Sequence, residues 1–305
     1  MTHFPEIHTP YISSEKMDEL LAEATDNPTF TAGGSNSKCF LSGDYAVLKT
    51  GNIEAGNDNF ASIIDDLDEL SQDGVAVARI LGYAITDYGK PYASGVRYDS
   101  GYIVQERAKV RELLDHKRVP VSFDPSRNTP ENRQYVLDYC TMLKNAPQWQ
   151  FNRFMRDLKA ITDKKIMVDP SKLTNFFYDE NEGFSFIDLN FRTKERLFDV
   201  ADLECNQTHR DFLHSAFAMI KEFPLYTFDT KEPMYSPAES EHIKSSMCLA
   251  FEKLATAAGK VGVLPADIED YFRDQKNPTS FSAGFSLYGL GSPAEISAFT
   301  RDLTK

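Results

Sequence analysis

Three polar residues could do chemistry in the stretch 164–192, which reads KKIMVDPSKLTNFFYDENEGFSFIDLNFR. They are Asp169, Asn175 and Asp188. Asn175 and Asp188 stand within apolar runs, where an unpartnered polar side chain is costly, so a functional role is favoured for them over a structural one. Amide and carboxylate oxygens are the ligands that Mg²⁺ takes when it also binds nucleotide phosphates. Asp169 would then be free to orient an attacking hydroxyl, although an Asp-Pro turn explains it equally well.

The elements that position these residues are predicted from the same stretch. The runs 175–178 and 184–189 are typical of two short strands, and the polar turn 179–183 joins them. A hairpin of this kind brings Asn175 and Asp188 to the same end. The sequence therefore predicts a metal site beside a β-hairpin.

Composition excludes several other classes of function. The chain has 305 residues, with 33 basic and 46 acidic side chains, so its net charge is 33 − 46 = −13. Because no run of Lys and Arg could follow a phosphate backbone, we expect no nucleic acid partner. No apolar window approaches the roughly 20 residues that span a bilayer, and the first residues do not resemble a signal peptide. We expect a cytoplasmic protein without a membrane span.

Four scattered cysteines offer neither a zinc site nor a disulfide framework. They are Cys39, Cys140, Cys205 and Cys248, and none forms a CxxC pair. Reduced thiols in a cytosol fit this pattern best.

The predicted secondary structure changes from mainly β to mainly helical near residue 108. Residues 30–108 read as short β-rich runs that are interrupted by one amphipathic helix, 59–72, with Gly74 just past its end. Beyond residue 108 the pattern is helical. The predicted helices are 131–145, 148–161, 208–222, 237–258, 265–275 and 293–303.

The order of polar residues in the opening stretch resembles the catalytic and metal-binding loops of protein kinases. The resemblance implies that Asp169 is the catalytic aspartate and that Lys172 faces the phosphates. It also implies that Asn175 and Asp188 bind the metal. The 13 positions from Asn175 to Asp188 are the step that the family usually has.

A second stretch carries the same resemblance. FTAGGSNSKCFLSGDYAVLKT, residues 30–50, reads as strand, glycine turn, strand, tight turn and strand, and its AVLK resembles the kinase VAIK. The turn whose backbone N–H groups would bind phosphate oxygens consists of Gly33, Gly34, Ser35, Asn36 and Ser37. Lys49 would reach the α- and β-phosphates. Taken singly, Lys49 could equally extend to solvent from an apolar strand, and the glycines could form an ordinary hairpin turn.

Two further parts of the chain resemble protein kinases, and they follow in the same order along the sequence as in that family. Asp66, in DLDEL, occupies the place of the helix carboxylate that pairs with Lys49, although Asp65 or Glu69 could serve instead and a solvated helix face is the simpler reading. GYIVQERA resembles the fifth strand and hinge. Gln105 would then be the gatekeeper, and the backbones of Glu106 and Ala108 would face adenine.

The resemblance implies an α+β, bilobal protein kinase-like fold. It has a small β-rich N-lobe with one main helix and a larger, mostly helical C-lobe. The expected domains are an N-terminal extension at 1–28, the N-lobe at 29–108 and the C-lobe at 109–305 with its helical C-terminal region.

The nearest resemblance is to the compact bacterial effector kinases of the OspG/NleH type. It implies an ATP- and Mg²⁺-dependent kinase, with Mn²⁺ as an alternative ion, that acts on a Ser, Thr or Tyr hydroxyl of a protein. It also implies secretion into a host cell without a cleaved signal, a host substrate and a host activator. Two alternatives stay open: the same fold with other chemistry (small-molecule kinase, AMP transfer or glutamylation), and an ATP-binding pseudokinase that acts as a binding module.

Overall fold

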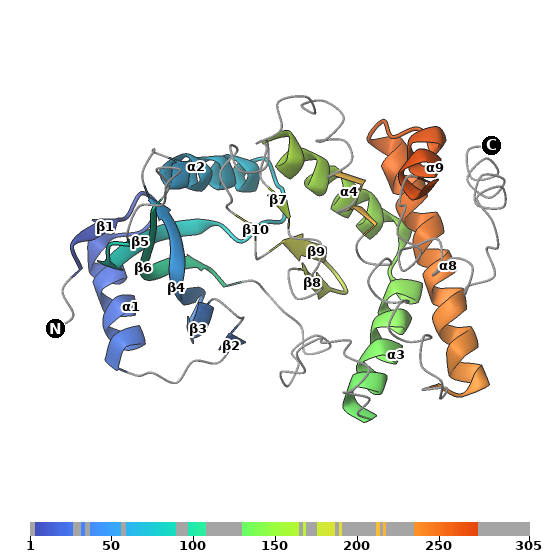
Figure 1. The fold of residues 1–305 in the computed structure, drawn as a ribbon, viewed down its shortest axis with the longest axis horizontal. Coiled ribbons are helices and arrows are strands. Elements are labelled where there is room, and N and C mark those ends of the chain that lie inside the picture. Colours follow the sequence, from blue (N-terminus) through green and yellow to red (C-terminus); the bar gives the residue numbers. More distant parts are fainter. Residues whose placement is uncertain are drawn as a thin grey trace. The chain divides into compact units, whose positions relative to one another are not determined.

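A six-stranded antiparallel sheet and several helices make up the described part of the chain, which is therefore of the predicted α+β class (Figure 1). The computed structural model describes residues 4–26, 32–33, 37–55, 59–89, 97–107, 130–164, 167–168, 176–186, 189–190, 212–213, 216–217 and 235–273. The chain divides into two units. The N-terminal unit is Met1–Lys109 with Ser185–Asp199, and the C-terminal unit is Val110–Phe184 with Val200–Lys305.

The sheet belongs to the N-terminal unit, and its strands lie in the order β1-β5-β6-β4-β3-β2. The strands are β1 Glu6–His8, β2 Ala32–Gly33, β3 Ser37–Ser42, β4 Tyr45–Ala55, β5 Ile80–Asp87 and β6 Arg97–Glu106. Each neighbouring pair is antiparallel. The same unit contains the short strand β10, Leu189–Asn190.

Two glycines fix the geometry of this sheet. Gly43, in the turn between β3 and β4, has φ +56°, a conformation that favours glycine. Gly101 in β6 lies so close to β5 that a Cβ atom there would come 2.1 Å from the carbonyl oxygen of Ala84. Only glycine therefore fits at position 101 without movement of the backbone.

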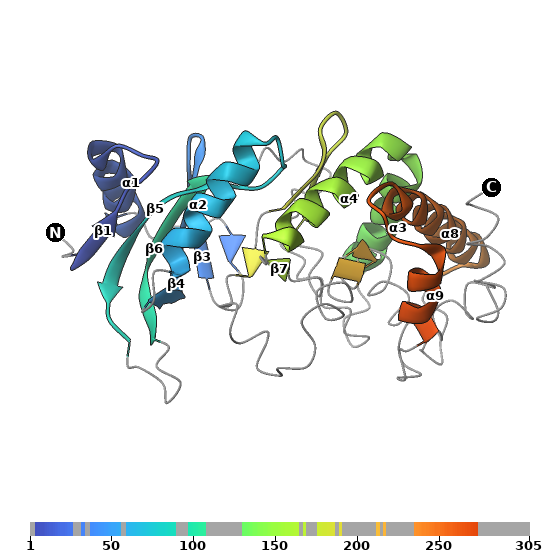
Figure 2. The ribbon, with the colours of Figure 1, turned by 90° about the horizontal axis from the view of Figure 1, so that it is seen from above.

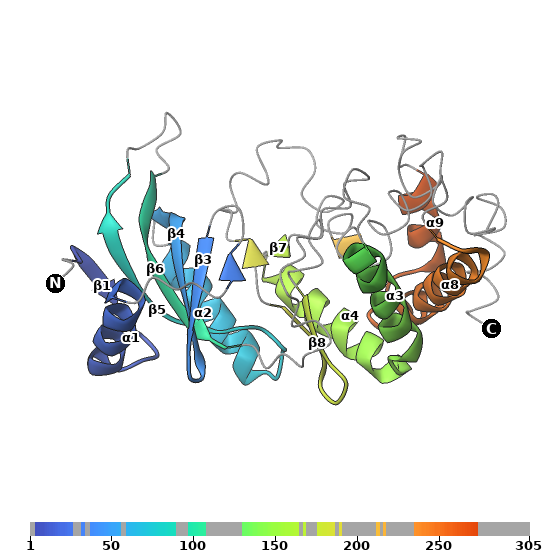
Figure 3. The same cartoon turned by 90° about the horizontal axis from the view of Figure 1, so that it is seen from below.

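Helices cover both faces of the sheet. α1, Ser14–Asp26, and α2, Asn59–Gln72, lie on opposite faces, as the views from above (Figure 2) and below (Figure 3) show. α1 buries an apolar side that packs against residues of β4, β5 and β6. The cluster consists of Met17, Leu20, Leu21, Ala24, Val47, Leu81, Ala84, Tyr102 and Val104. α2 buries Ile64, Leu67 and Leu70 and packs on β4 and β5.

The described C-terminal unit is mainly helical. Its elements are α3 Pro130–Asn145, α4 Gln148–Asp163, β7 Met167–Val168, β8 Phe176–Asp179, β9 Gly183–Phe186 (which ends in the N-terminal unit), α8 Pro237–Lys260 and α9 Pro265–Arg273. α8 packs along α3 and α4. The Nζ of Lys253 donates hydrogen bonds to the carbonyl oxygens of Leu143, Lys144 and Ala146, which lie at and just beyond the end of α3. This contact satisfies carbonyl groups that a helix end leaves without partners.

Most of the predicted elements that fall on described residues are confirmed. α2 begins and ends where the periodicity predicts, and Gly74 follows it with φ +79°. The helix predicted at 208–222 is described only at 212–213 and 216–217, and the helix at 293–303 lies outside the described residues. The bilobal kinase-like arrangement stays a prediction. Within the described ranges, none of the helices has the length and apolar character needed to cross a membrane.

Candidate functional site

The strongest sequence signal falls on the hairpin of β8 and β9, which form a two-stranded sheet as predicted. The turn between them is held by Asp179, whose Oδ1 accepts hydrogen bonds from the backbone N–H groups of Asn181 at 2.7 Å and Glu182 at 3.0 Å. Gly183 follows with φ +82°. An aspartate that binds the backbone two residues ahead is a common way to fix such a turn.

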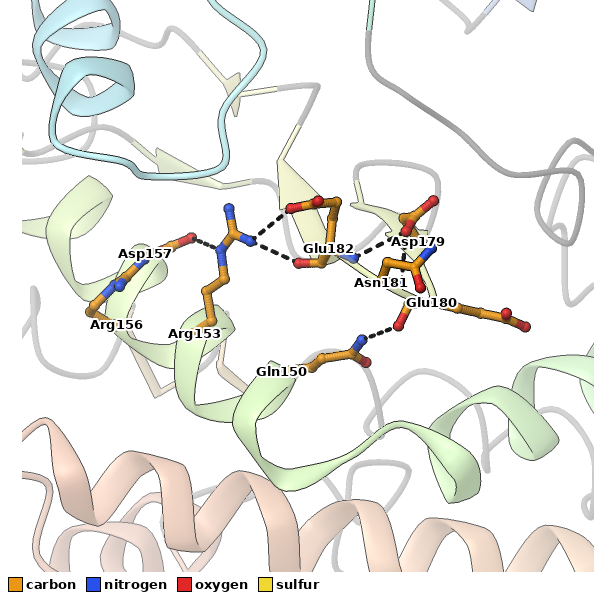
Figure 4. Close-up of polar contacts among 8 residues, drawn as sticks. All are labelled: Gln150, Arg153, Arg156, Asp157, Asp179, Glu180, Asn181 and Glu182. Atoms are coloured by element: carbon orange, nitrogen blue, oxygen red, sulfur yellow. Dashed lines mark hydrogen bonds and ion pairs between the residues drawn. The ribbon is translucent and has the colours of Figure 1, made fainter.

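Side chains of helix α4 bind the backbone of this turn (Figure 4). Nε2 of Gln150 donates to the carbonyl oxygen of Glu180 at 2.8 Å, and a guanidinium N–H of Arg153 donates to the carbonyl oxygen of Glu182 at 2.9 Å. Gly183 packs so tightly on Gln150 that a Cβ atom would lie 3.1 Å from its Cγ. The turn is therefore fixed by shape as well as by hydrogen bonds.

A buried carboxylate orients the arginine of this contact. Asp157 is 0% exposed, and its Oδ1 accepts hydrogen bonds from Arg156 at 2.6 and 2.9 Å. Its other oxygen lies 3.6 Å from Nε of Arg153. Because a buried charge is stable only when it is paired, Asp157 holds Arg153 in position for the turn.

Aromatic packing fixes the strands of the hairpin. The ring of Phe184 contacts those of Phe151, Phe154 and Tyr178 with centroid distances of 5.5, 5.6 and 5.0 Å. Burial raises the pKa of the Tyr178 hydroxyl, so this group is neutral at physiological pH. Phe184 therefore connects the hairpin to two aromatic residues of α4.

The residues predicted to bind metal and phosphate flank this hairpin. Asn175 precedes the first residue of β8, and Asp188 follows the last residue of β9 by two positions. Both of them, with Asp169 and Lys172, lie outside the described residues. Among the described residues, no group of three or more His, Cys, Asp or Glu side chains could hold a metal ion.

The structure does not bring Lys49 and Asp66 together. Lys49 lies opposite Tyr102 in the sheet, and its Nζ is 5.8 Å from the centroid of the Tyr102 ring. It therefore points to the same face as Val47, which packs under α1. Asp66 is half-buried and belongs to α2, which lies on the other face of the sheet (Figure 2). The sheet lies between the two residues.

The predicted phosphate-binding turn is described only at its ends. Gly33 pairs with Lys38 across β2 and β3, and Ser37 pairs with Thr50 across β3 and β4. Gly34, Ser35 and Asn36 lie outside the described residues. The strands on either side of the turn are those that the sequence predicts.

The predicted adenine-binding edge is the end of β6. Gln105 is half-buried and lies opposite Ala46, and the N–H of Glu106 donates to the carbonyl oxygen of Arg79 at 2.9 Å. Ala108 lies outside the described residues. The close attachment of Glu106 to Arg79 was not predicted, because the two residues are far apart in the sequence.

Arg79 contacts two carboxylates at this edge. Its guanidinium donates to Oε1 of Glu106 at 2.9 and 3.2 Å and to Oδ1 of Asp68 at 2.7 Å. The hydrogen bond to Asp68 raises the pKa of Arg79 above its ordinary value. A pocket of about 370 Å³ lies beside this group, and its lining includes Lys16 and Tyr45.

Comparisons of the chain with protein-family models and with curated proteins found no match.

Proposed function

We propose that the chain is an ATP- and Mg²⁺-dependent phosphotransferase of the protein kinase-like type that acts on a protein hydroxyl. The observation that carries the proposal is the hairpin of β8 and β9, held on α4 by Gln150 and Arg153. The residues that the sequence assigns to the metal, Asn175 and Asp188, flank the two strands of this hairpin. A rigid support is what a metal site needs, because small displacements of its ligands weaken binding.

Each residue has a defined task in this proposal. Asn175 and Asp188 would hold Mg²⁺, which neutralises charge on the nucleotide phosphates when it is bound. Asp169 would orient the acceptor hydroxyl for attack on the γ-phosphorus and accept its proton, while the bond from the γ-phosphorus to the bridging oxygen breaks and ADP leaves. Lys172 would contact the transferred phosphoryl group. Transfer by such a site depends on positioning and electrostatics.

The N-terminal unit supports the proposal through its chain order. The strands β2, β3 and β4 precede α2, and β5 and β6 follow it, which is the order that the resemblance implies. The sheet places β4 between β3 and β6, so the turn predicted for phosphate and the end of β6 belong to one sheet.

The position of Lys49 favours one alternative. Because Lys49 lies on the face covered by α1, away from α2, it does not form the ion pair that active protein kinases use. An ATP-binding pseudokinase that recognises a partner would not need this ion pair. Transfer of AMP, glutamylation and small-molecule phosphorylation are further uses of the same nucleotide site.

Label transfer tests the proposal. Purified protein is incubated with Mg²⁺ and either γ-³²P-ATP or α-³²P-ATP, with and without a eukaryotic cell extract. We expect protein label from γ-³²P-ATP that disappears in Asp188→Ala and persists in Asp163→Ala, which removes an exposed carboxylate at the end of α4. Label from α-³²P-ATP would indicate nucleotide transfer. Binding of ATP without any label would favour the pseudokinase.

A further inference from the structure

Arg79 joins three elements of the N-terminal unit. Its carbonyl oxygen accepts the N–H of Glu106 at 2.9 Å, and its guanidinium binds the carboxylate of the same residue. The third contact of Arg79 is to Asp68 of α2 at 2.7 Å. Arg79, the residue immediately before β5, therefore holds the end of β6 by backbone and side chain, and holds α2 as well.

Tyr11 forms a second connection between α2 and the region around Arg79. Its ring centroid lies 6.0 Å from the guanidinium carbon of Arg79, and its hydroxyl donates to Asp65 of α2 at 2.9 Å. Its backbone N–H donates to the carbonyl oxygen of Leu81 in β5. The segment before α1 thus repeats the link between α2 and β5.

The residue of α2 that contacts Arg79 is buried and fully paired. Asp68 is 5% exposed, and Nε2 of Gln72 donates to its second oxygen at 2.6 Å. Because a buried carboxylate without partners is costly, separation of Asp68 from Arg79 and Gln72 would destabilise this part of the fold. Glu106 is more exposed, with 40% of its side chain accessible, so its ion pair can break without leaving a buried charge. The contact of Arg79 with Asp68 of α2 is therefore costly to break, whereas its ion pair with Glu106 at the end of β6 can open and close.

We propose that Arg79 is a positioning residue that couples helix α2 to the end of β6, so that a nucleotide base bound at Glu106 also orders α2. The coupling to nucleotide rests on the proposed function, because the adenine edge is assigned from it. The coupling is reciprocal. If bound nucleotide favours the ordered state of α2 by some factor, then ordering of α2 strengthens nucleotide binding by the same factor. The mechanical link between α2 and β6 does not depend on that assignment.

Two substitutions separate this role from a purely structural one. Glu106→Gln removes the adjustable ion pair and leaves Arg79 with Asp68 intact. Arg79→Lys keeps a cation for Asp68 but cannot bind two carboxylates with the planar fork of arginine. Glu19→Gln is the matched control, because it removes a carboxylate from an exposed ion pair with Lys16 in the same unit.

Amide hydrogen exchange of residues 59–72 is the first measurement, in the full chain without nucleotide. We expect faster exchange in Glu106→Gln and Arg79→Lys than in the wild type and in Glu19→Gln. Equal exchange in Glu106→Gln and in the wild type would overturn the link between α2 and β6.

ATP titration is the second measurement. We expect ATP to slow exchange of residues 59–72 in the wild type, and Arg79→Lys to weaken ATP binding by about fivefold or more. Normal ATP affinity in a folded Arg79→Lys protein would overturn the coupling to nucleotide. If the wild type binds no ATP, the proposed function and the coupling to nucleotide both fail, and the exchange without nucleotide still decides whether Arg79 couples α2 to β6.

Discussion

Gln150 of α4 donates a hydrogen bond to the carbonyl oxygen of Glu180 in the turn of the β8–β9 hairpin, at 2.8 Å. The two residues are 30 positions apart in the sequence. Their contact attaches the turn of the hairpin to helix α4 of the C-terminal unit.

Replacement of Gln150 should therefore affect stability and activity together. The side chain is 0% exposed, so Gln150→Ala leaves a cavity and an unpaired carbonyl group, and we expect a loss of about 2–4 kcal/mol of unfolding free energy. Urea unfolding measures this loss. Gln134→Ala is the control, because Gln134 is exposed on α3 and should change stability by less than about 0.5 kcal/mol. A Gln150→Ala protein as stable as this control would contradict the role given to the contact.

The contact between α3 and α8 predicts a pH dependence of stability. Hydrogen bonds from Arg133 and Ser236 lower the pKa of Glu239 from its ordinary value of 4.5 to about 2. Because the folded pKa is the lower one, the charged carboxylate stabilises the fold above pH 4.5, and this contribution is lost as the pH falls towards 2.

Thermal unfolding of the wild type and of Glu239→Gln, followed from pH 7 to pH 2, tests this expectation. The wild type should be more stable at pH 7, and the difference in Tm should shrink between pH 4.5 and pH 2. A difference that is independent of pH would show that the charge of Glu239 does not contribute.

Two glycines should respond to alanine in opposite directions. Gly101→Ala places a Cβ atom 2.1 Å from a backbone oxygen that cannot rotate away, so we expect a loss of at least about 1–3 kcal/mol. Gly259→Ala lies in α8 with no atom within 4 Å of the new Cβ, and we expect a gain of about 0.5–1 kcal/mol. Denaturant titration of both variants measures the two changes. Similar effects at the two positions would contradict the packing of β5 against β6.

Lys49 provides a test of the nucleotide site. From the resemblance alone, Lys49→Ala should abolish transfer as completely as Asp188→Ala. The position of Lys49 predicts a smaller loss, because its exposed side chain lies by the ring of Tyr102, on the sheet face opposite α2. Initial rates of label transfer for the two variants decide between these expectations. Equal and complete loss would mean that Lys49 reaches the nucleotide by another arrangement of the N-terminal unit.

Local patterns predicted the elements well. The helix at 59–72 was predicted from apolar residues three and four positions apart, and the hairpin was predicted from two short apolar runs around a polar turn. Both signals are contained in a few neighbouring residues. The structure describes these elements close to where the sequence places them.

Helix α1 was missed, although the sequence contains a signal for it. Met17, Leu20, Leu21 and Ala24 are spaced as one face of a helix, and the hydroxyl of Ser13 accepts the N–H of Lys16 at its start. Residues 1–28 were predicted only as an extension, and the structure shows that β1 and α1 complete the sheet and cover one of its faces.

Long-range contacts could not be predicted. Arg79 meets Asp68 and Glu106 at sequence separations of 11 and 27 positions, and no local pattern distinguishes this arginine from any other. The face on which Lys49 lies was also beyond sequence reasoning, because a shift of one residue in a strand moves a side chain to the other face. The residues at the centre of the proposed chemistry, Asp169, Asn175 and Asp188, lie outside the described residues.

Calorimetric titration with ATP, with and without Mg²⁺, shows whether Asn175 and Asp188 hold a metal ion at a nucleotide site. The proteins are the wild type, Asn175→Ala, Asp188→Ala and the control Asp163→Ala. We expect Mg²⁺ to strengthen ATP binding in the wild type and in Asp163→Ala. We expect this strengthening to disappear in Asn175→Ala and Asp188→Ala. Absence of ATP binding by the wild type would rule out the nucleotide site, and the same effect of Mg²⁺ in all four proteins would rule out Asn175 and Asp188 as its metal ligands.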